Sequence, residues 1–310
     1  MRIFDAAATR AALPFDRLIP ALHLAFAAGC VAPTRHVHEI ASPGGERLTS
    51  LIMPAWLEGR YYGVKIINVA PGNAARGLPG LHASYLLFDA TTGAPLALID
   101  GDEITSRRTA AASALAASWL VRNGPQRLVV VGAGRIARLL YDAHRVVRPI
   151  ERVTIWARSS GSAQALAGEL RQRGAPAEAT DDLESAVRDA DIVSCATLAT
   201  APLIRGGWLR AGSHLDLIGS FTPSMREADD GCFAGASLYV DDAEALQKSG
   251  DLVGPLQRGV FAASDVRGTL AMLAKGEAAG RRSVDERTVF KSVGVALEDL
   301  AAACLLYEGA

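Results

Sequence analysis

Hydrophobic and polar residues follow different patterns in different parts of this chain. Over residues 1–112 the pattern predicts an amphipathic helix and then strands separated by Gly, Pro and Asn turns; the helix is Phe15–Gly29, and the strands are Leu48–Met53, Tyr61–Val69, Ala83–Phe88 and Pro95–Asp100. Because these strands succeed one another without helices, a mostly antiparallel or mixed sheet is expected. The Ala-rich run from Thr105 to Arg122 predicts a helix that leads into the next domain.

Strands and helices alternate over residues 113–284. Strands are predicted at Val129–Val131, Arg152–Ala157, Ile192–Thr197, His214–Gly219 and Ser237–Val240, with helices at Ala163–Arg173 and from an Asp181-Asp182 cap to Asp189. Such apolar runs are typical of a parallel sheet covered on both faces. The expected fold class is therefore α/β: a Rossmann-type doubly wound parallel sheet domain beside an α+β substrate and dimerisation domain.

The last segment, Asp285–Leu306, has apolar residues at helical spacing, among them Val289, Val293 and Leu300. We predict one helix here, without a sheet partner. It is expected to pack back onto the first domain, so that residues 285–310 complete that domain.

Composition restricts the classes of partner. The chain has 310 residues, half of them hydrophobic, and a net charge of −1, which gives no overall field that favours nucleic acid or an anionic membrane. Four dispersed cysteines, with no paired spacing, favour a reducing compartment over a disulfide framework or a zinc site. We find no signal-peptide pattern and no uninterrupted apolar run of about 18 residues. The expectation is a cytoplasmic protein whose partners are small molecules or copies of itself.

A glycine turn in the middle of the chain is the strongest chemical signal. The strand Val129–Val131 runs into Gly132-Ala133-Gly134-Arg135-Ile136-Ala137, a G-x-G-x-x-A pattern that opens a helix and suits a dinucleotide pyrophosphate. Arg158 and Ser159 follow the second strand, where an NAD-binding chain usually carries an acid. Arginine and hydroxyls there suit a 2′-phosphate, so NADP(H) is preferred and NAD(H) remains an alternative; Arg158 as an ordinary solvated cation is the competing interpretation.

Cations of the first domain are the candidates for holding a substrate. Arg35, Lys65 and Arg108, if they converge, would bind a carboxylate. Lys65 has apolar neighbours on both sides, so it lies either at a solvated sheet edge or in a pocket. Arg108 is expected in the first turn of its helix, where the helix dipole disfavours a cation unless an anion is nearby.

Other polar residues carry weaker signals. His82 is a candidate for contact with substrate or nicotinamide, with a structural role as the alternative. His36 and His38 alternate along a predicted strand but lack further ligands at metal spacing, so no metal site is predicted. Lys291-Ser292-Val293-Gly294 places small residues where a cofactor approaches closely, although helix packing explains Gly294 equally well.

Several motifs together resemble the ornithine cyclodeaminase/mu-crystallin family over nearly the whole chain. They are Met53-Pro54-Ala55, Gly63-Val64-Lys65, Asn73 to Pro79, Thr92 to Leu96, Asp100-Gly101, Arg107 to Ala111, the Gly132 turn and Phe290 to Gly294. The resemblance implies a homodimer, a first domain that holds the substrate carboxylate through Arg35, Lys65 and Arg108, and a second domain that binds NAD(H) or NADP(H). The cofactor contacts expected are Thr109, Gly132, Ala133, Gly134, Arg135, Ile136, Arg158, Ser159, Thr197, Ser292 and Val293.

Two departures from the family's cyclodeaminases narrow the expected activity. Phe221 stands where they carry an aspartate before a proline, and Leu51 stands where they carry a glutamate before the Met-Pro pair. The anchors for the distal ammonium of ornithine are thus absent, and burying that ammonium unpaired is costly. The run from Gly219 to Glu227 instead resembles that of family members that reduce cyclic 2-ketimines. Reduction of pyrroline-2-carboxylate or piperideine-2-carboxylate is therefore the leading hypothesis, with Lys65 as the catalytic residue that supplies or relays the imine proton.

Three alternatives stay open. Ornithine cyclodeaminase activity would release ammonia from ornithine and form proline with NAD. An amino-acid dehydrogenase, like the family's alanine dehydrogenases, would oxidise a linear amino acid. A non-catalytic protein that binds NADPH and a small ligand, like mu-crystallin, would show no turnover.

Overall fold

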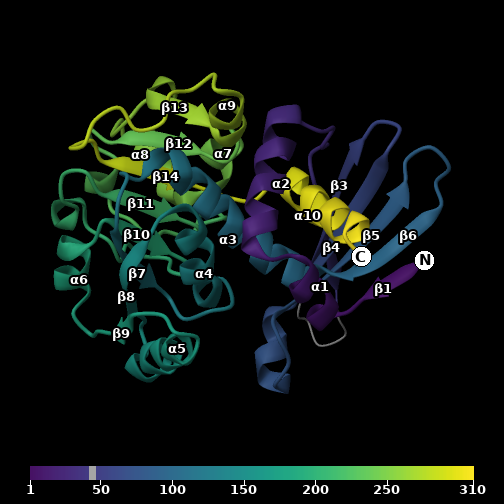
Figure 1. The fold of residues 1–310 in the computed structure, drawn as a ribbon, viewed down its shortest axis with the longest axis horizontal. Coiled ribbons are helices and arrows are strands. Elements are labelled where there is room, and N and C mark those ends of the chain that lie inside the picture. The colour runs from purple at the N-terminus through teal and green to yellow at the C-terminus, as the bar shows by residue number, and fades with distance from the viewer. Residues whose placement is uncertain (42–46) are drawn as a thin grey trace. The chain divides into compact units, whose positions relative to one another are not determined.

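The computed structural model describes residues 1–41 and 47–310 and divides into two compact units (Figure 1). The first unit comprises Met1–Arg108 and Val295–Ala310, and the second comprises Thr109–Gly294. Helix α3 (Gly101–Leu120) contains the division between them.

The first unit is a mixed six-stranded sheet with helices on one face. Its strands are β1 (Arg2–Phe4), β2 (His36–Ala41), β3 (Arg47–Leu57), β4 (Tyr61–Val69), β5 (Leu81–Asp89) and β6 (Pro95–Asp100), and its helices besides α3 are α1 (Ala6–Ala12), α2 (Phe15–Ala28) and α10 (Ala296–Glu308). The order is β1-β6-β5-β4-β3-β2, with β1 parallel to β6 and the other pairs antiparallel. The predicted mixed sheet is therefore confirmed.

Side chains of the central strands alternate between the two sheet faces. Gly63, Lys65 and Ile67 of β4 are buried on one face, and α10 packs against β3 and β4. A methyl group at position 63 would lie 1.9 Å from Tyr85 Oη, so glycine is required where the Tyr85 ring crosses β4. The buried face of the sheet therefore has no room for a larger side chain at position 63.

The second unit is an eight-stranded parallel sheet with the order β13-β12-β14-β11-β10-β7-β8-β9. Its strands are β7 (Gln126–Val131), β8 (Ile150–Trp156), β9 (Ala177–Ala179), β10 (Ile192–Cys195), β11 (His214–Leu217), β12 (Ser237–Val240), β13 (Val266–Thr269) and β14 (Thr288–Lys291). Its helices are α4 (Ala137–Val147), α5 (Ser160–Gln172), α6 (Leu183–Asp189), α7 (Ala245–Lys248), α8 (Gly250–Gln257) and α9 (Leu270–Lys275). This is the doubly wound α/β fold expected from the alternating pattern.

The predicted helix over Asp285–Leu306 is wrong in its first half. Residues Thr288–Lys291 form β14, which lies between β12 and β11, and the helix begins only at Ala296. All four residues of β14 are buried, so the strand lacks the polar alternation that distinguishes a strand from a helix. Val289 and Val293 fit both spacings, which is why the sequence pattern misled.

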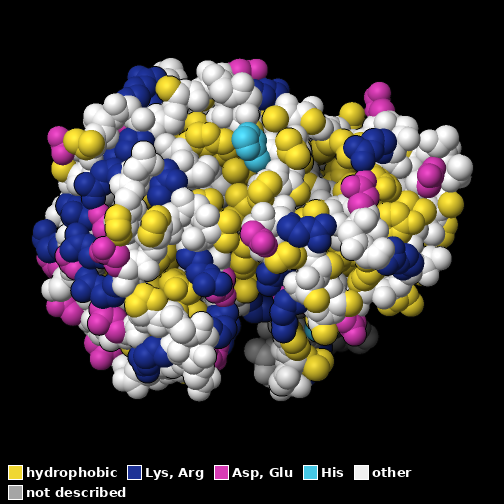
Figure 2. Space-filling view, viewed as in Figure 1, with side chains coloured by type: hydrophobic (Ala, Val, Ile, Leu, Met, Phe, Trp, Pro, Cys, Tyr) yellow, Lys and Arg dark blue, Asp and Glu magenta, His cyan; other side chains and the backbone are white. Residues whose placement is uncertain are grey.

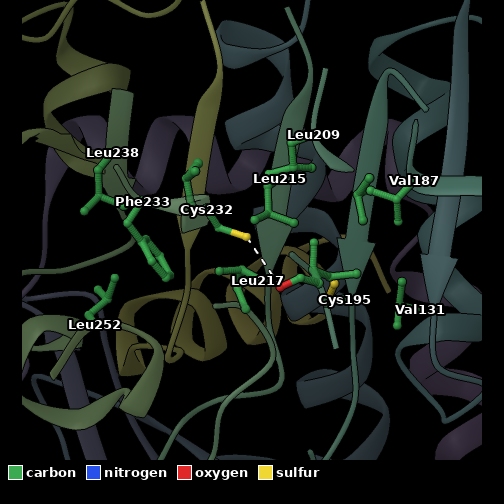
Figure 3. Packing of buried hydrophobic residues seen from close by; sticks show 14 of the residues in the cluster. Val131, Val187, Cys195, Leu209, Leu215, Leu217, Cys232, Phe233, Leu238 and Leu252 are labelled. Carbon is green, nitrogen blue, oxygen red and sulfur yellow. Dashed lines mark hydrogen bonds between the residues drawn. The ribbon is translucent and has the colours of Figure 1, made fainter. Parts of the chain in front are cut away.

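Buried apolar side chains form a core against the eight-stranded sheet. Figure 3 shows residues from adjacent strands, including Val131, Cys195 and Leu217, pointing into one cluster with Phe233 and Leu252 from the connecting segments. Each of these five side chains is no more than 2% exposed. All four cysteines are free, and burial raises the pKa of the Cys195 thiol well above its usual range.

On the face of the molecule shown in Figure 2, charges of both signs are mixed. Figure 2 shows basic and acidic side chains interspersed over the second unit, where Arg127 and Arg152 both pair with Asp189. Among the described residues no single helix has the length and hydropathy of a membrane span; α1 and α2 reach that composition only as a pair bent by 75°.

Candidate active site

Four charged side chains meet inside the first unit. Lys65 Nζ lies 2.5 Å from Asp299 Oδ2, and Arg108 Nε donates to Asp299 Oδ1 at 2.9 Å. Arg108 Nη1 also donates to Glu298 Oε2 at 2.5 Å. None of the four side chains is more than 7% exposed. Two cations and two carboxylates thus balance in a dry environment, where each charge requires a partner.

Burial and neighbouring charges together set the protonation of this group. Burial lowers the pKa of Lys65 to about 8; Asp299 opposes this shift, while Arg108 adds to it. The carboxylates Asp299 and Glu298 raise the pKa of Arg108, which stays charged. Lys65 is therefore a group that gains and loses a proton near neutral pH, which suits acid–base chemistry.

The structure decides the open question about Lys65. Strand β4 lies in the interior of the sheet, between β3 and β5, so the solvated-edge interpretation is wrong. The lysine side chain is 0% exposed and is aimed at α10, with Thr105 Oγ1 3.5 Å from its Nζ. The hydrocarbon neighbours in sequence lie on the other face of the sheet because a strand alternates its side chains.

The expected setting of Arg108 is also corrected. Helix α3 begins at Gly101 rather than at Thr105, so Arg108 is not in the first turn and the helix dipole does not explain it. The anion inferred near this arginine does exist, but it is the pair Glu298 and Asp299 of the chain itself.

The other two predicted substrate residues differ in their placement. Arg35 directly precedes β2, whose first paired residue faces Ile52, and the next residue of β3, Met53, pairs with Lys65. Continuing this register places Arg35 across from Met53, about two strand spacings or roughly 10 Å from Lys65. His82 is exposed and pairs with Asn68, so it lies on the face opposite Lys65 and Tyr85.

Sequence reasoning missed Glu298, Asp299 and Tyr85. Two adjacent acids in the first turn of α10 match what a helix N-terminus ordinarily prefers, so nothing local marked them as buried partners of distant cations. Tyr85 is paired with Lys65 across β4 and β5 and is fully buried, and burial together with Asp299 raises its pKa well above the usual range. The signal available in the sequence was a polar side chain, Tyr85, in the strand predicted after that of Lys65.

The glycine turn of the second unit has the shape of a phosphate cradle. Gly132 adopts φ 122°, and a methyl group there would lie 2.6 Å from the Ala196 carbonyl oxygen. A methyl group at position 134 would have no atom within 4 Å. Ile136, the N-cap of α4, has an apolar side chain that cannot accept a hydrogen bond from the first turn of the helix. Open space next to the backbone N–H groups at a helix N-terminus fits a pyrophosphate.

Most of the remaining predicted cofactor residues lie in the glycine turn or follow strands at the carboxyl edge of the sheet. Arg158 and Ser159 follow β8 and are exposed, and Ser159 caps α5 by accepting from Ser162 N. Thr197 follows β10, which neighbours β7 on the side opposite β8. The strand order therefore reverses at β7, beside the Gly132 turn, and doubly wound folds bind ligands at such a switch point. The rest are Ala133 and Arg135 in the turn, Thr109 buried on α3, and Ser292 and Val293 directly after β14.

Residues 1–41 and 47–310 contain no group of three His, Cys, Asp or Glu side chains arranged to hold an ion. The rings of His36 and His38 stack on β2 with centroids 6.4 Å apart.

Several known proteins are similar to this chain in both sequence and fold. A Delta(1)-pyrroline-2-carboxylate reductase from Paracoccus denitrificans is 45% identical over 254 residues, covering 81% of this chain and 80% of that protein. The structure of Thermococcus litoralis Delta(1)-pyrroline-2-carboxylate reductase in complex with NADH and L-proline matches with a TM-score of 0.92 and 32% identity, over 100% of this chain and 97% of that one.

A third similar protein is an archaeal alanine dehydrogenase dimer with bound NAD. Its TM-score is 0.91 at 30% identity, over 100% of this chain and 95% of that one. The family model that matches this chain covers residues 18–310, which include both units almost completely. The resemblance inferred from the motifs is confirmed: the chain belongs to the ornithine cyclodeaminase/mu-crystallin family.

Proposed function

We propose that this protein is an NADPH-dependent reductase of cyclic 2-ketimine carboxylates such as Delta(1)-pyrroline-2-carboxylate. The observation that carries the proposal is Lys65, a fully buried lysine with a pKa of about 8 beside Asp299. Reduction of a C=N bond needs one hydride at carbon and one proton at nitrogen, and a lysine of this pKa is an acid suited to the second role. The relatives that carry this activity in their names support the substrate class.

The proposal gives roles to four side chains of the first unit. Lys65 supplies or relays the proton to the imine nitrogen, and Asp299 positions the ammonium. Arg35, Lys65 and Arg108 hold the carboxylate next to the C=N bond, for which Lys65 and Arg108 must partly exchange their contacts with Asp299. His82 is left out because it lies on the opposite sheet face. A reduced nicotinamide supplies the hydride.

The preference for NADPH rests on Arg158. It follows β8, the position from which doubly wound folds contact the adenosine ribose, and no acid occupies the positions beside it. Its guanidinium is exposed and suits a 2′-phosphate through charge-assisted hydrogen bonds.

We propose a homodimer formed through the sheet face opposite Lys65. On that face Pro54, Val64, Leu86 and Leu98 make one cross-strand row of apolar side chains that remain only half-buried. A second row, Trp56, Tyr62 and Phe88, forms ring contacts with centroids 6.4 Å and 5.5 Å apart. Contiguous apolar surface of this kind marks an interface between proteins. The free cysteines fit the reducing conditions of a cytoplasmic protein.

The test follows NADPH absorbance with purified protein and pyrroline-2-carboxylate, piperideine-2-carboxylate, or pyruvate plus ammonia, beside an ammonia assay on ornithine with NAD. NADPH consumption with a cyclic imine and no ammonia from ornithine is expected. Turnover only with pyruvate and ammonia would instead support the dehydrogenase alternative that the alanine dehydrogenase structure favours. Ammonia and proline from ornithine would contradict the proposal.

A further inference from the structure

A second buried group of charges lies at the carboxyl ends of the central strands of the eight-stranded sheet. We name it the Lys291 cluster: Lys291 at the end of β14, Glu227, Asp241 directly after β12, and Asp251 in the first turn of α8. All four residues are 0–1% exposed. Buried charges are costly unless they pair or accept hydrogen bonds, so this group must have a structural or functional cause.

Glu227 joins the segments that follow two neighbouring strands. Its Oε1 accepts from Thr197 N and Thr197 Oγ1, both at 2.7 Å, and its Oε2 accepts from Gly219 N at 2.7 Å. Thr197 follows β10 and Gly219 follows β11. A methyl group at position 219 would lie 2.0 Å from the Thr197 carbonyl oxygen and 2.4 Å from Glu227 Oε1, so glycine is required for this approach.

The other two carboxylates act in the same way on further segments. Asp241 Oδ2 accepts from Val293 N and Gly294 N, both at 2.7 Å, and so holds the turn after β14. Asp251 Oδ1 accepts from Glu227 N at 2.8 Å and thereby fixes the backbone of Glu227 itself. Glu227 and Asp241 therefore hold the backbone after β10, β11 and β14, and Asp251 holds the backbone of Glu227.

Lys291 supplies the positive charge at the centre of these acids. Its Nζ lies 3.8 Å from Asp251 Oδ2 and forms no hydrogen bond among the described residues. Its charge lowers the pKa of Glu227 and of Asp241, but burial dominates and leaves both pKa values above their usual range. The ionisation of Glu227 and Asp241 is therefore sensitive to the loss of this one ammonium.

The place of the cluster relative to the glycine turn connects it with the cofactor. Strands β8 and β10 flank β7 on opposite sides, and Arg158 on the β8 side marks the adenosine end of a dinucleotide whose pyrophosphate lies at Gly132. The nicotinamide end then extends toward the segments after β10, β11 and β14. Those are the segments that the Lys291 cluster holds, and they contain Thr197, Ser292 and Val293.

We infer that the Lys291 cluster positions the nicotinamide half of the bound dinucleotide, with Glu227 as the positioning residue that sets the segments after β10 and β11 relative to each other. The inference rests on dinucleotide binding by the second unit, as proposed above. It assigns no contact with the substrate to these residues, which act through the backbone groups that they hold.

The test compares Glu227→Gln with Glu184→Gln, which makes the same chemical change at an exposed acid of the same unit. Glutamine keeps the size of the side chain, but its amide nitrogen cannot accept from Gly219 N as Oε2 does. We expect calorimetry to show about tenfold to hundredfold weaker binding of NADPH by Glu227→Gln, with affinity for 2′-phospho-ADP-ribose, which lacks the nicotinamide, within about twofold of the parent protein. Glu184→Gln should match the parent protein with both ligands.

Turnover gives a second readout. If the cyclic imine is reduced, Glu227→Gln should lower kcat by about tenfold to hundredfold and raise the primary isotope effect with 4-deuterated NADPH, because a misplaced ring slows hydride transfer. Unchanged affinities and kcat would overturn the inference, as would equal losses for NADPH and for the fragment, which indicate general damage. Because the binding arm needs no imine turnover, failure of the proposed reaction leaves it informative.

A lysine variant controls for misfolding. Lys291→Met removes the charge but keeps most of the apolar stem, whereas Lys291→Arg keeps the charge. We expect the Lys291→Met protein to show the same selective loss of NADPH over the fragment at pH 8, because the buried acids lose their counter-charge. If Lys291→Met unfolds, Glu227→Gln remains decisive.

Discussion

Lys65 shows how a single side chain acquires chemistry from its surroundings. Its own sequence context marks it as unusual, because a charged residue interrupts an apolar strand. Whether it faces solvent or an interior follows from the position of β4 in the sheet, and its partner Asp299 lies on the last helix of the chain. The type of residue was predictable, but its partner and pKa were not.

The pH dependence of turnover tests Lys65 as the acid. If protonated Lys65 is required, log kcat/KM stays level below pH 8 and falls by about one per pH unit above it. Asp299 raises the lysine pKa, so Asp299→Asn should shift this break to lower pH. Lys65→Arg should lower kcat/KM strongly at every pH and show no break near pH 8, because guanidinium stays charged and does not release a proton. A break that stays near pH 8 in all three proteins belongs to the substrate or to another group.

The proposed preference for NADPH can be tested at one residue, Arg158. Arg158→Ala should raise the KM for NADPH by about tenfold to hundredfold, the effect of losing a hydrogen bond to a charged group worth about 1.5–3 kcal/mol. The KM for NADH serves as the internal control and should change less than about twofold, because NADH lacks the 2′-phosphate. Equal changes for both cofactors would contradict a role of Arg158 in recognising that phosphate.

At the scale of elements, segments with a sustained hydrophobic pattern were predicted correctly, whereas a short strand with every residue buried was not. Tyr61–Val69 and Pro95–Asp100 were predicted with their observed bounds, and Asp182 caps α6 as expected. Strand β14 has four residues, all buried, and was mistaken for helix. The helix that carries Arg108 was placed four residues late because its first turn contains Gly101 and two acids rather than apolar residues.

The packing of β4 against β5 offers a stability test. Gly63→Ala puts a methyl group 1.9 Å from Tyr85 Oη, so we expect the free energy of unfolding to fall by at least about 1–3 kcal/mol, as in other overpacked cores. Gly161→Ala on α5 is the control, because no atom lies closer than 3.9 Å to its added methyl group. That change should be neutral or stabilising by up to about 1 kcal/mol. Chemical denaturation measures both, and equal effects would argue against the clash.

At the scale of the whole molecule, the sheet of the first unit has one face under helices and one face of half-buried apolar rows. Leu86→Lys puts a charge in the middle of one row and should convert the proposed dimer into monomers. Met272→Lys, at an exposed apolar residue of α9, should leave the mass unchanged. Sedimentation measures both. A dimer that persists in Leu86→Lys at micromolar concentration would place the interface elsewhere.

The sequence by itself determined the two kinds of sheet, the glycine turn, the family and the candidate cations, because each depends on local periodicity or on a short motif. Tertiary structure decided which of these residues share an environment. Lys65 on β4, Arg108 on α3 and Asp299 on α10 are distant in the chain and meet only because these elements pack together. Glu227 and Lys291 acquire their setting from strands that are neighbours in the sheet but distant in the chain. Contacts of this kind follow from how the elements pack, and no local pattern encodes them.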